Sequence, residues 1–181
     1  MNRFVFVIAA LCSLTVGCGA SSPTAPSEDS STTTTFTVPL SAANEVPAIS
    51  NADANASGTA TIALNVTKDA SGAITSATAN FQITVTGFPA GTTVTDAHIH
   101  NAAAGSNGGV VVNATLTSGE LAIVNGGGSI TKNGINVPAD RASAILSNPS
   151  AHYFNVHTAL NPDGAIRGQL SAGTITGGSD Y

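Results

Sequence analysis

The sequence predicts one all-β domain, an antiparallel β-sandwich or barrel-like fold with a single short helix. Three observations predict it: apolar and polar residues alternate over several short segments, turn residues separate these segments, and helical periodicity is almost absent. Period-two alternation rich in Thr and Val is typical of strands with one buried face. Short connections between such strands favour antiparallel pairing.

The expected strands follow the alternation along the chain. Residues 36–40 alternate first, and two later segments do so most cleanly. Their apolar residues should share one inward face: Ala60, Ile62, Leu64 and Val66 in the first, and Phe81, Ile83 and Val85 in the second. Residues 69–72 predict a hairpin turn. Further strands are expected at 94–100, 109–116, 121–124, 152–158 and 165–170.

One segment departs from the strand pattern. Pro138 is followed by alanine-rich sequence to Leu146, and Asn148 and Pro149 come directly after it. Proline suits the first turn of a helix, and a second proline cannot continue one. We therefore expect a short helix over 138–146.

The N-terminus predicts export. Positively charged Arg3 precedes the apolar segment 4–16, which is too short to span a bilayer and fits a secretory signal. Residues 14–18, Leu-Thr-Val-Gly-Cys, resemble a bacterial lipobox, and this resemblance implies cleavage before Cys18 and lipidation of that residue. Ordinary secretion with cleavage nearby is the alternative.

These signals divide the chain into four parts. We expect a lipoprotein-type signal peptide at 1–17, a lipid-anchored disordered linker at 18–35, the folded domain at 36–171 and a flexible tail at 172–181. The linker is rich in Ser, Thr and Pro and lacks apolar periodicity. The expected location is the bacterial cell envelope, at the outer membrane or cell surface, or the exterior if no lipid is added.

Composition excludes several classes of function. Five basic residues stand against ten acidic ones, for a net charge of −5, and no basic cluster exists to neutralise nucleic-acid phosphates. A polybasic membrane patch is excluded for the same reason, so membrane contact is expected through the lipid. Cys12 lies in the signal segment and Cys18 lies at the expected cleavage site, so disulfides and thiolate metal sites are excluded from the folded part.

The four histidines are the chemically most informative residues. His98 and His100 lie two apart on an expected strand, so they share a face with Asp96. His157 lies on a later strand and shares its face with two polar residues, Tyr153 and Asn155. His152 is five residues from His157, so it should face the opposite side of the strand, and we do not include it among the candidate metal ligands. Three converging imidazoles are enough for a metal site.

Five motifs in order along the chain are similar to those of the CHRD domain family, which is named after chordin and also occurs singly in bacterial secreted proteins. They are Asn44-Glu45-Val46-Pro47, His98-Ile99-His100-Asn101, Asn107-Gly108, Tyr153-Phe154-Asn155-Val156-His157-Thr158 and the segment 162–170. The resemblance covers residues 36–170. It implies an immunoglobulin-like β-sandwich that is secreted or surface-exposed, and it implies no common catalytic activity.

Two interpretations of the histidines stay open. His98, His100 and His157 can bind zinc or copper, with Asp96, Asn155 or water completing the shell. Alternatively, they form a buried hydrogen-bond network that fixes strand register. Glu45 and Arg167 either recognise a ligand beside the histidines or, as we favour, form an ion pair between the first motif and the last strand.

The function predicted from the sequence is a binding or structural module with a candidate three-histidine metal site. An envelope protein or a polysaccharide is the expected kind of partner. The alternative is an extracytoplasmic enzyme built on the histidine cluster, either a metal-dependent oxidoreductase or a polysaccharide-acting hydrolase or lyase that uses Tyr153. No serine lies in a nucleophile-elbow motif, so catalysis through serine is not expected.

Overall fold

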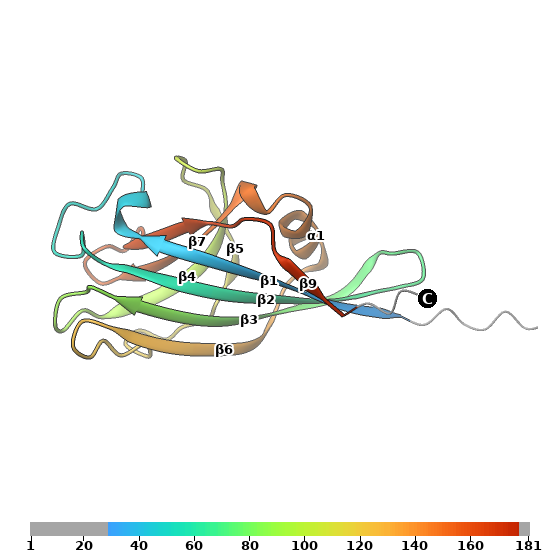
Figure 1. The fold of residues 1–181 in the computed structure, drawn as a ribbon, viewed down its shortest axis with the longest axis horizontal. Helices are drawn as coiled ribbons and strands as arrows, with labels where there is room; N and C mark the ends of the chain where they lie inside the picture. Colours follow the sequence, from blue (N-terminus) through green and yellow to red (C-terminus); the bar gives the residue numbers. More distant parts are fainter. Residues whose placement is uncertain (1–28, 178–181) are drawn as a thin grey trace, which may run out of the picture.

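The computed structural model describes residues 29–177 (Figure 1). Nine strands, one α-helix and two 3₁₀ turns are found in this range. The strands are β1 (Ser30–Ser41), β2 (Ser57–Lys68), β3 (Ile74–Thr86), β4 (Val94–Asn101), β5 (Gly109–Asn113), β6 (Gly128–Asn136), β7 (His152–Thr158), β8 (Ile166–Gln169) and β9 (Thr174–Thr176). The helices are η1 (Ala42–Asn44), α1 (Ala139–Ser147) and η2 (Pro149–Ala151). No helix in the described range is long and apolar enough to cross a membrane.

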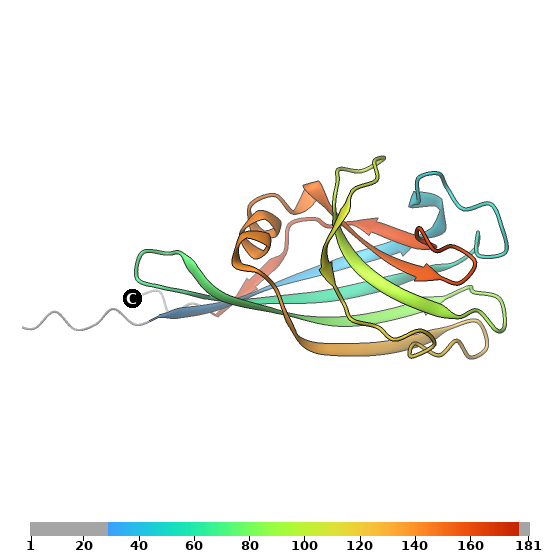
Figure 2. The ribbon, with the colours of Figure 1, turned by 180° about the vertical axis from the view of Figure 1, so that it is seen from behind.

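All strands pair antiparallel, as the sequence predicted, but they form one continuous sheet. The order is β5-β4-β7-β8-β1-β2-β3-β6, with β9 added beside β1. The sheet curls so that the half containing β4 and β7 lies over the half containing β1 to β3 (Figures 1 and 2). The two halves meet at β1 and β8, where Ser41 opposite Arg167 is the one register pair. The expected sandwich of two sheets is therefore not confirmed, because this seam makes the domain a curled half-barrel.

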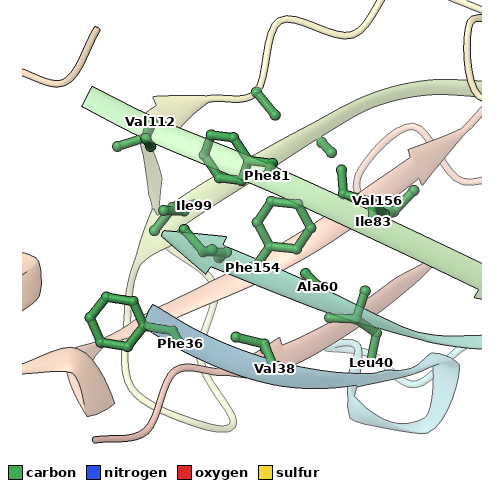
Figure 3. Close-up of a cluster of buried hydrophobic side chains, with 14 of the residues drawn as sticks. Phe36, Val38, Leu40, Ala60, Phe81, Ile83, Ile99, Val112, Phe154 and Val156 are labelled. Atoms are coloured by element: carbon green, nitrogen blue, oxygen red, sulfur yellow. The ribbon is translucent and has the colours of Figure 1, made fainter. Parts of the chain in front are cut away.

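The core fills the space between the two halves. Phe81 of β3 stacks on Phe154 of β7, with ring centroids 5.8 Å apart (Figure 3). The alternation predicted for β2 and β3 is confirmed, since the residues expected to face inward are all 2 % exposed or less. Burial of each large aliphatic or aromatic side chain stabilises the fold by about 1.5–3 kcal/mol.

The predicted helix is also confirmed. Helix α1 begins directly after Pro138 and ends before Asn148. Ala142 and Ile145 are its buried residues, and α1 packs against β3. The helix therefore closes one end of the core.

Four details of the sequence prediction are corrected. β1 begins at Ser30, within the expected linker, and Thr33 pairs with Asn65 of β2. β9 lies in the expected flexible tail and pairs with β1. β-branched threonines favour extended backbone in both segments, although their polarity resembles that of a linker. Residues 121–124 form no strand beyond a bridge between Val124 and Gly127, whereas β6 was not predicted.

The segment expected to be a signal peptide, Cys18 and most of the expected linker lie outside the described residues, as does the end of the expected tail.

Candidate three-histidine metal centre

Strands β4, β7 and β8 turn a polar face away from the core. The β4–β7 register places His98 opposite Asn155 and Asp96 opposite His157, and the β7–β8 register places Asn155 opposite Arg167. Alternate residues of a strand point to one side, so these side chains share a face. We call this patch the polar face; its members are Asp96, His98, His100, Tyr153, Asn155, His157, Arg167 and Gln169.

Three loops cover the polar face. They are residues 42–56 after β1, residues 102–108 between β4 and β5, and residues 159–165 between β7 and β8. Each loop supplies main-chain carbonyl groups that accept hydrogen bonds from side chains of the polar face. As a result all seven residues of β7 are buried, although its outward side chains are polar. Such a covered polar layer is stable only when its groups are paired.

Two of the imidazoles are oriented by loop carbonyl groups. Nδ1 of His100 lies 2.9 Å from the carbonyl oxygen of Gly108, and Nδ1 of His157 lies 2.8 Å from that of Pro162. A carbonyl oxygen only accepts, so each Nδ1 carries the proton. In the neutral imidazole, Nε2 then keeps its lone pair. Nε2 of His100 is buried and has no hydrogen-bond partner among the described residues.

The third imidazole is oriented by a carboxylate. Nε2 of His98 lies 3.1 Å from Oδ2 of Asp96, so it donates to the carboxylate. Nδ1 of His98 lies 2.9 Å from Nε2 of His157. In the neutral tautomers that these partners favour, the two nitrogens face each other with lone pairs. Such a contact is repulsive unless a proton or a cation lies between them.

The free nitrogens of the three histidines therefore converge. Ligand atoms of His98, His100 and His157 all lie within 4.8 Å of one another. Two nitrogens bound to one zinc ion at about 2.0–2.1 Å lie about 3.4 Å apart in a tetrahedral site, so the widest pair would close by at most about 1.4 Å. Small rotations of the rings can supply that movement.

Burial favours the neutral form of His98 and His100. It lowers the pKa of His98 below 6.5, although Asp96 opposes the shift, and it lowers the pKa of His100 in the same direction. A neutral imidazole is the form that binds a metal. The side chain of His98 is 13 % exposed and that of Asp96 is 32 % exposed, so solvent reaches the cluster from this side.

Asn155 lies between the histidines and the rest of the polar face. Its Oδ1 is 3.0 Å from Nε2 of His157, and its Nδ2 has no partner among the described residues. Turning the amide would let Nδ2–H donate to the lone pair of His157 when no metal is present.

Glu45 and Arg167 form an ion pair beneath the covering loops. Oε2 of Glu45 lies 3.4 Å from Nε of Arg167, and both side chains are at most 5 % exposed. Arg167 also donates from Nε to the carbonyl oxygen of Asn44 and from a terminal nitrogen to that of Ser106, at 2.7 and 3.0 Å. Burial raises the pKa of Glu45 to about 7, against the opposing effect of the guanidinium. The pair joins the first motif, which carries Glu45, to β8, which carries Arg167.

Tyr153 connects this ion pair to the histidine cluster. Its ring stacks on His100, with centroids 4.7 Å apart and 6° between the planes. The guanidinium carbon of Arg167 lies 4.5 Å from the centroid of the same ring. Cation–π contacts of this kind stabilise desolvated arginine. Tyr153 is 4 % exposed, so it acts by packing the layer.

His152 lies apart from the cluster, as strand parity predicted. It is buried, and its Nδ1 lies 3.0 Å from the carbonyl oxygen of Asn148.

A second buried polar cluster was missed in the sequence. Asp53 is 1 % exposed, and its Oδ2 accepts from Thr158 Oγ1 at 2.8 Å and from Asn161 Nδ2 at 2.6 Å. Asn161 also accepts from Asn51 at 2.7 Å. These contacts tie the 42–56 loop to the 159–165 loop, which carries the carbonyl group that orients His157. No motif marks Asp53, because isolated acids in polar loops are common.

Comparison with known families gives one match. The CHRD domain family matches residues 36–170, which is most of the chain. No curated protein and no solved structure matches the chain.

Proposed function

The chain belongs to the CHRD domain family, and we propose that it is an exported binding or structural module that holds a transition-metal ion on His98, His100 and His157. One observation carries the proposal. Each imidazole donates from one nitrogen to an oxygen atom and turns its other nitrogen toward the same small region. Metal-ligating histidines are oriented in this way by their outer partners.

The donor set indicates the class of metal. Three imidazole nitrogens with no thiolate suit Zn²⁺ or Cu²⁺, whereas Ca²⁺ and Mg²⁺ prefer oxygen ligands. Asp96 holds His98 in the required tautomer. The bound ion would supply Lewis acidity, and His98 and Asp96 are the residues through which solvent reaches the cluster.

The covering loops favour binding over catalysis. A catalytic metal needs an open coordination position in a cleft that admits substrate. Tyr153, the residue that a polysaccharide-acting enzyme on this site would use, is 4 % exposed, and His100 and His157 are each 7 % exposed. These burials support a site that holds a small ion in a formed layer.

Elemental analysis of the purified full chain tests the metal site. We expect about one zinc or copper ion per chain, and loss of that ion in the His98→Ala/His100→Ala double variant. His152→Gln is the matched control, because His152 is buried but lies outside the cluster, and it should keep the metal. A metal content that is the same in the double variant would refute the site. Absence of metal in every form, with a lowered melting temperature in the double variant, would instead support the hydrogen-bond network.

The proposal extends to location. Lipidation of Cys18 would anchor the domain at the cell envelope and leave an envelope protein or a polysaccharide as the available partner. Incorporation of labelled fatty acid into the wild-type chain, and its loss in Cys18→Ser, tests the anchor. Release of both proteins into the medium without label would indicate ordinary secretion.

A further inference from the structure

The inner face of the sheet continues past the core at one end. Strands β1, β2 and β3 extend beyond α1, so the helix covers only part of this face (Figures 1 and 2). Thr34 of β1, which faces inward, lies opposite Ile175 of β9. Residues directly opposite in paired strands share a face, so Ile175 is on the core side of the sheet. It is nevertheless 69 % exposed.

A pocket of about 410 Å³ lies between this end of the sheet and the turn that follows α1. Thr34, Phe36 and Ile175 line it from the sheet, and Leu146 of α1 and Pro149 of η2 line it from the helical side. The volume is within the range of about 300–1,000 Å³ that is usual for small-molecule sites. The pocket can therefore hold a small ligand.

Apolar side chains predominate in the lining of this pocket. Phe36 is 2 % exposed, Leu146 and Pro149 are half-buried, and Ile175 is open to solvent. The pocket thus runs from the solvent to the edge of the core. Apart from Lys68, its polar side chains are those of two threonines. Removing the apolar lining from water is favourable, so the body of a ligand should be apolar.

Lys68 supplies the only charge in the lining of the pocket. Among the basic residues that the structure describes, it alone forms no ion pair, whereas Lys132, Arg141 and Arg167 each have an acidic partner. Asp140 lines a neighbouring hollow that shares Lys68, but its side chain is 76 % exposed and pairs with Arg141. A negatively charged group at the end of an apolar ligand would complement Lys68.

We propose that this pocket binds a free fatty acid of medium chain length, with the alkyl chain on the apolar lining and the carboxylate paired with the ammonium group of Lys68. One cation matches one negative charge, and a single alkyl chain suits the volume better than the two chains of a phospholipid. A peptide would leave amide groups unpaired against the apolar lining, at a cost in free energy. The pocket shares no residue with the histidine cluster, so this inference can fail while the metal site stands.

The test is a titration of the full chain with sodium decanoate at about pH 7.5, where a carboxylic acid is ionised. Binding is measured by calorimetry and located by NMR of backbone amides. We expect saturable shifts in residues 32–36, 146–149 and 172–175 and at Lys68. Affinity should fall about fourfold for each methylene removed from the ligand. Decyltrimethylammonium, with the same alkyl chain and a positive head, should bind at least about tenfold more weakly.

Variants separate the pocket from general attraction. Lys68→Gln should weaken decanoate binding about tenfold, whereas Lys132→Gln, which removes a charge outside the pocket, should leave it unchanged. Ile175→Thr should weaken binding severalfold, and Val124→Thr is its matched control because Val124 is 67 % exposed and lies elsewhere. Lys68 is half-buried and the other three are exposed or half-buried, so all four variants should fold. Equal binding of decanoate and decyltrimethylammonium would overturn the proposal, as would wild-type affinity in Lys68→Gln.

Two other occupants of the pocket would give different results. If a second copy covers it, the wild type should sediment as a dimer that Ile175→Thr dissociates, and decanoate should not bind the dimer. If a lipid on Cys18 fills it, decanoate should bind Cys18→Ser and not the wild type. Either result would overturn the proposal, which requires equal decanoate binding by a monomeric wild type and by Cys18→Ser.

Discussion

The titration of Glu45 should make the domain less stable as the pH rises toward neutrality. Glu45 is buried against Arg167, and burial raises its pKa from 4.5 to about 7. Glu45→Gln keeps the shape of the side chain and removes the titration. Arg167 retains its two loop carbonyl acceptors in the variant. The difference in unfolding free energy between the two proteins, followed against pH, therefore isolates the effect of this one carboxyl group.

The sign and the size follow from proton linkage. Between pH 4.5 and about 7 the folded protein holds the Glu45 proton while the unfolded chain has released it. The folded state binds more protons in this window, so its stability falls as the pH rises. A shift of about 2.5 pKa units corresponds to about 3 kcal/mol. Wild type should thus lose about 3 kcal/mol relative to Glu45→Gln between about pH 4.5 and pH 8.

His98 and His100 change the stability in the opposite direction, but their contribution is the same in both proteins and cancels in the comparison. Burial lowers the pKa of His98 and His100 below 6.5, so the unfolded chain takes up protons first on acidification. Their contribution to stability is present above that value and is lost as the pH falls through their lowered pKa. Because both proteins keep these histidines, the difference curve reports Glu45 alone.

Urea unfolding at several pH values provides the measurement. The samples contain a chelator, so that metal binding does not contribute. At each pH the two proteins are compared by the urea concentration at the unfolding midpoint and by the slope of unfolding free energy against urea concentration. We expect the two stability curves to run together below about pH 4.5 and to separate progressively between about pH 4.5 and pH 7, with the variant more stable. Parallel curves over the whole range, or a wild type that gains stability relative to the variant as the pH rises, would refute the reasoning.

Three further predictions concern the metal, the covering loops and the core. A zinc or copper concentration of about 100 times Kd should stabilise wild type by about 2.7 kcal/mol in thermal unfolding, and a similar gain in His98→Ala/His100→Ala would contradict the site. Asp53→Ala should cost about 3 kcal/mol in urea unfolding, because two donors lose a buried carboxylate, whereas Asp53→Asn should cost less; equal losses would argue against this role. Phe154→Ala should cost about 3–5 kcal/mol, since the ring is fully buried on Phe81, and a loss below about 1 kcal/mol would show that the two halves do not pack as described.

The strands with one buried face could be predicted because burial imposes a period of two on their residues. β6 could not, since it is an edge strand whose residues are exposed or half-buried, and Gly134 and Lys132 interrupt any apolar pattern. The first half of β1 was not predicted as a strand either, because it also lacks an apolar alternation. Its threonines pair along β2 but have the composition of a linker. The continuity of the sheet across β1 and β8 depends on one residue pair, which no local pattern reveals.

The candidate site was predictable where strand geometry determines it. The alternation of side chains along each strand alone placed His98, His100 and His157 on one side of the sheet and His152 on the other. The partners that orient two of the rings are carbonyl groups of Gly108 and Pro162, and every residue has a carbonyl group. Only the folded loops show which ones matter. The same holds for Asp53, whose role depends on a contact with residues more than 100 positions away.

The seam between β1 and β8 has a consequence for the order of folding. Asn44 and Arg167, which hydrogen-bond across it, are 123 residues apart, whereas His98 and His157 are 59 apart. Closing the longer segment costs more chain entropy, by about 0.6 kcal/mol for a doubling of length. We expect β4 and β7 to pair before the seam between β1 and β8 closes. The three histidines proposed as metal ligands would then meet before the domain is complete, so an ion bound by them would stabilise a partly folded chain as well as the folded domain.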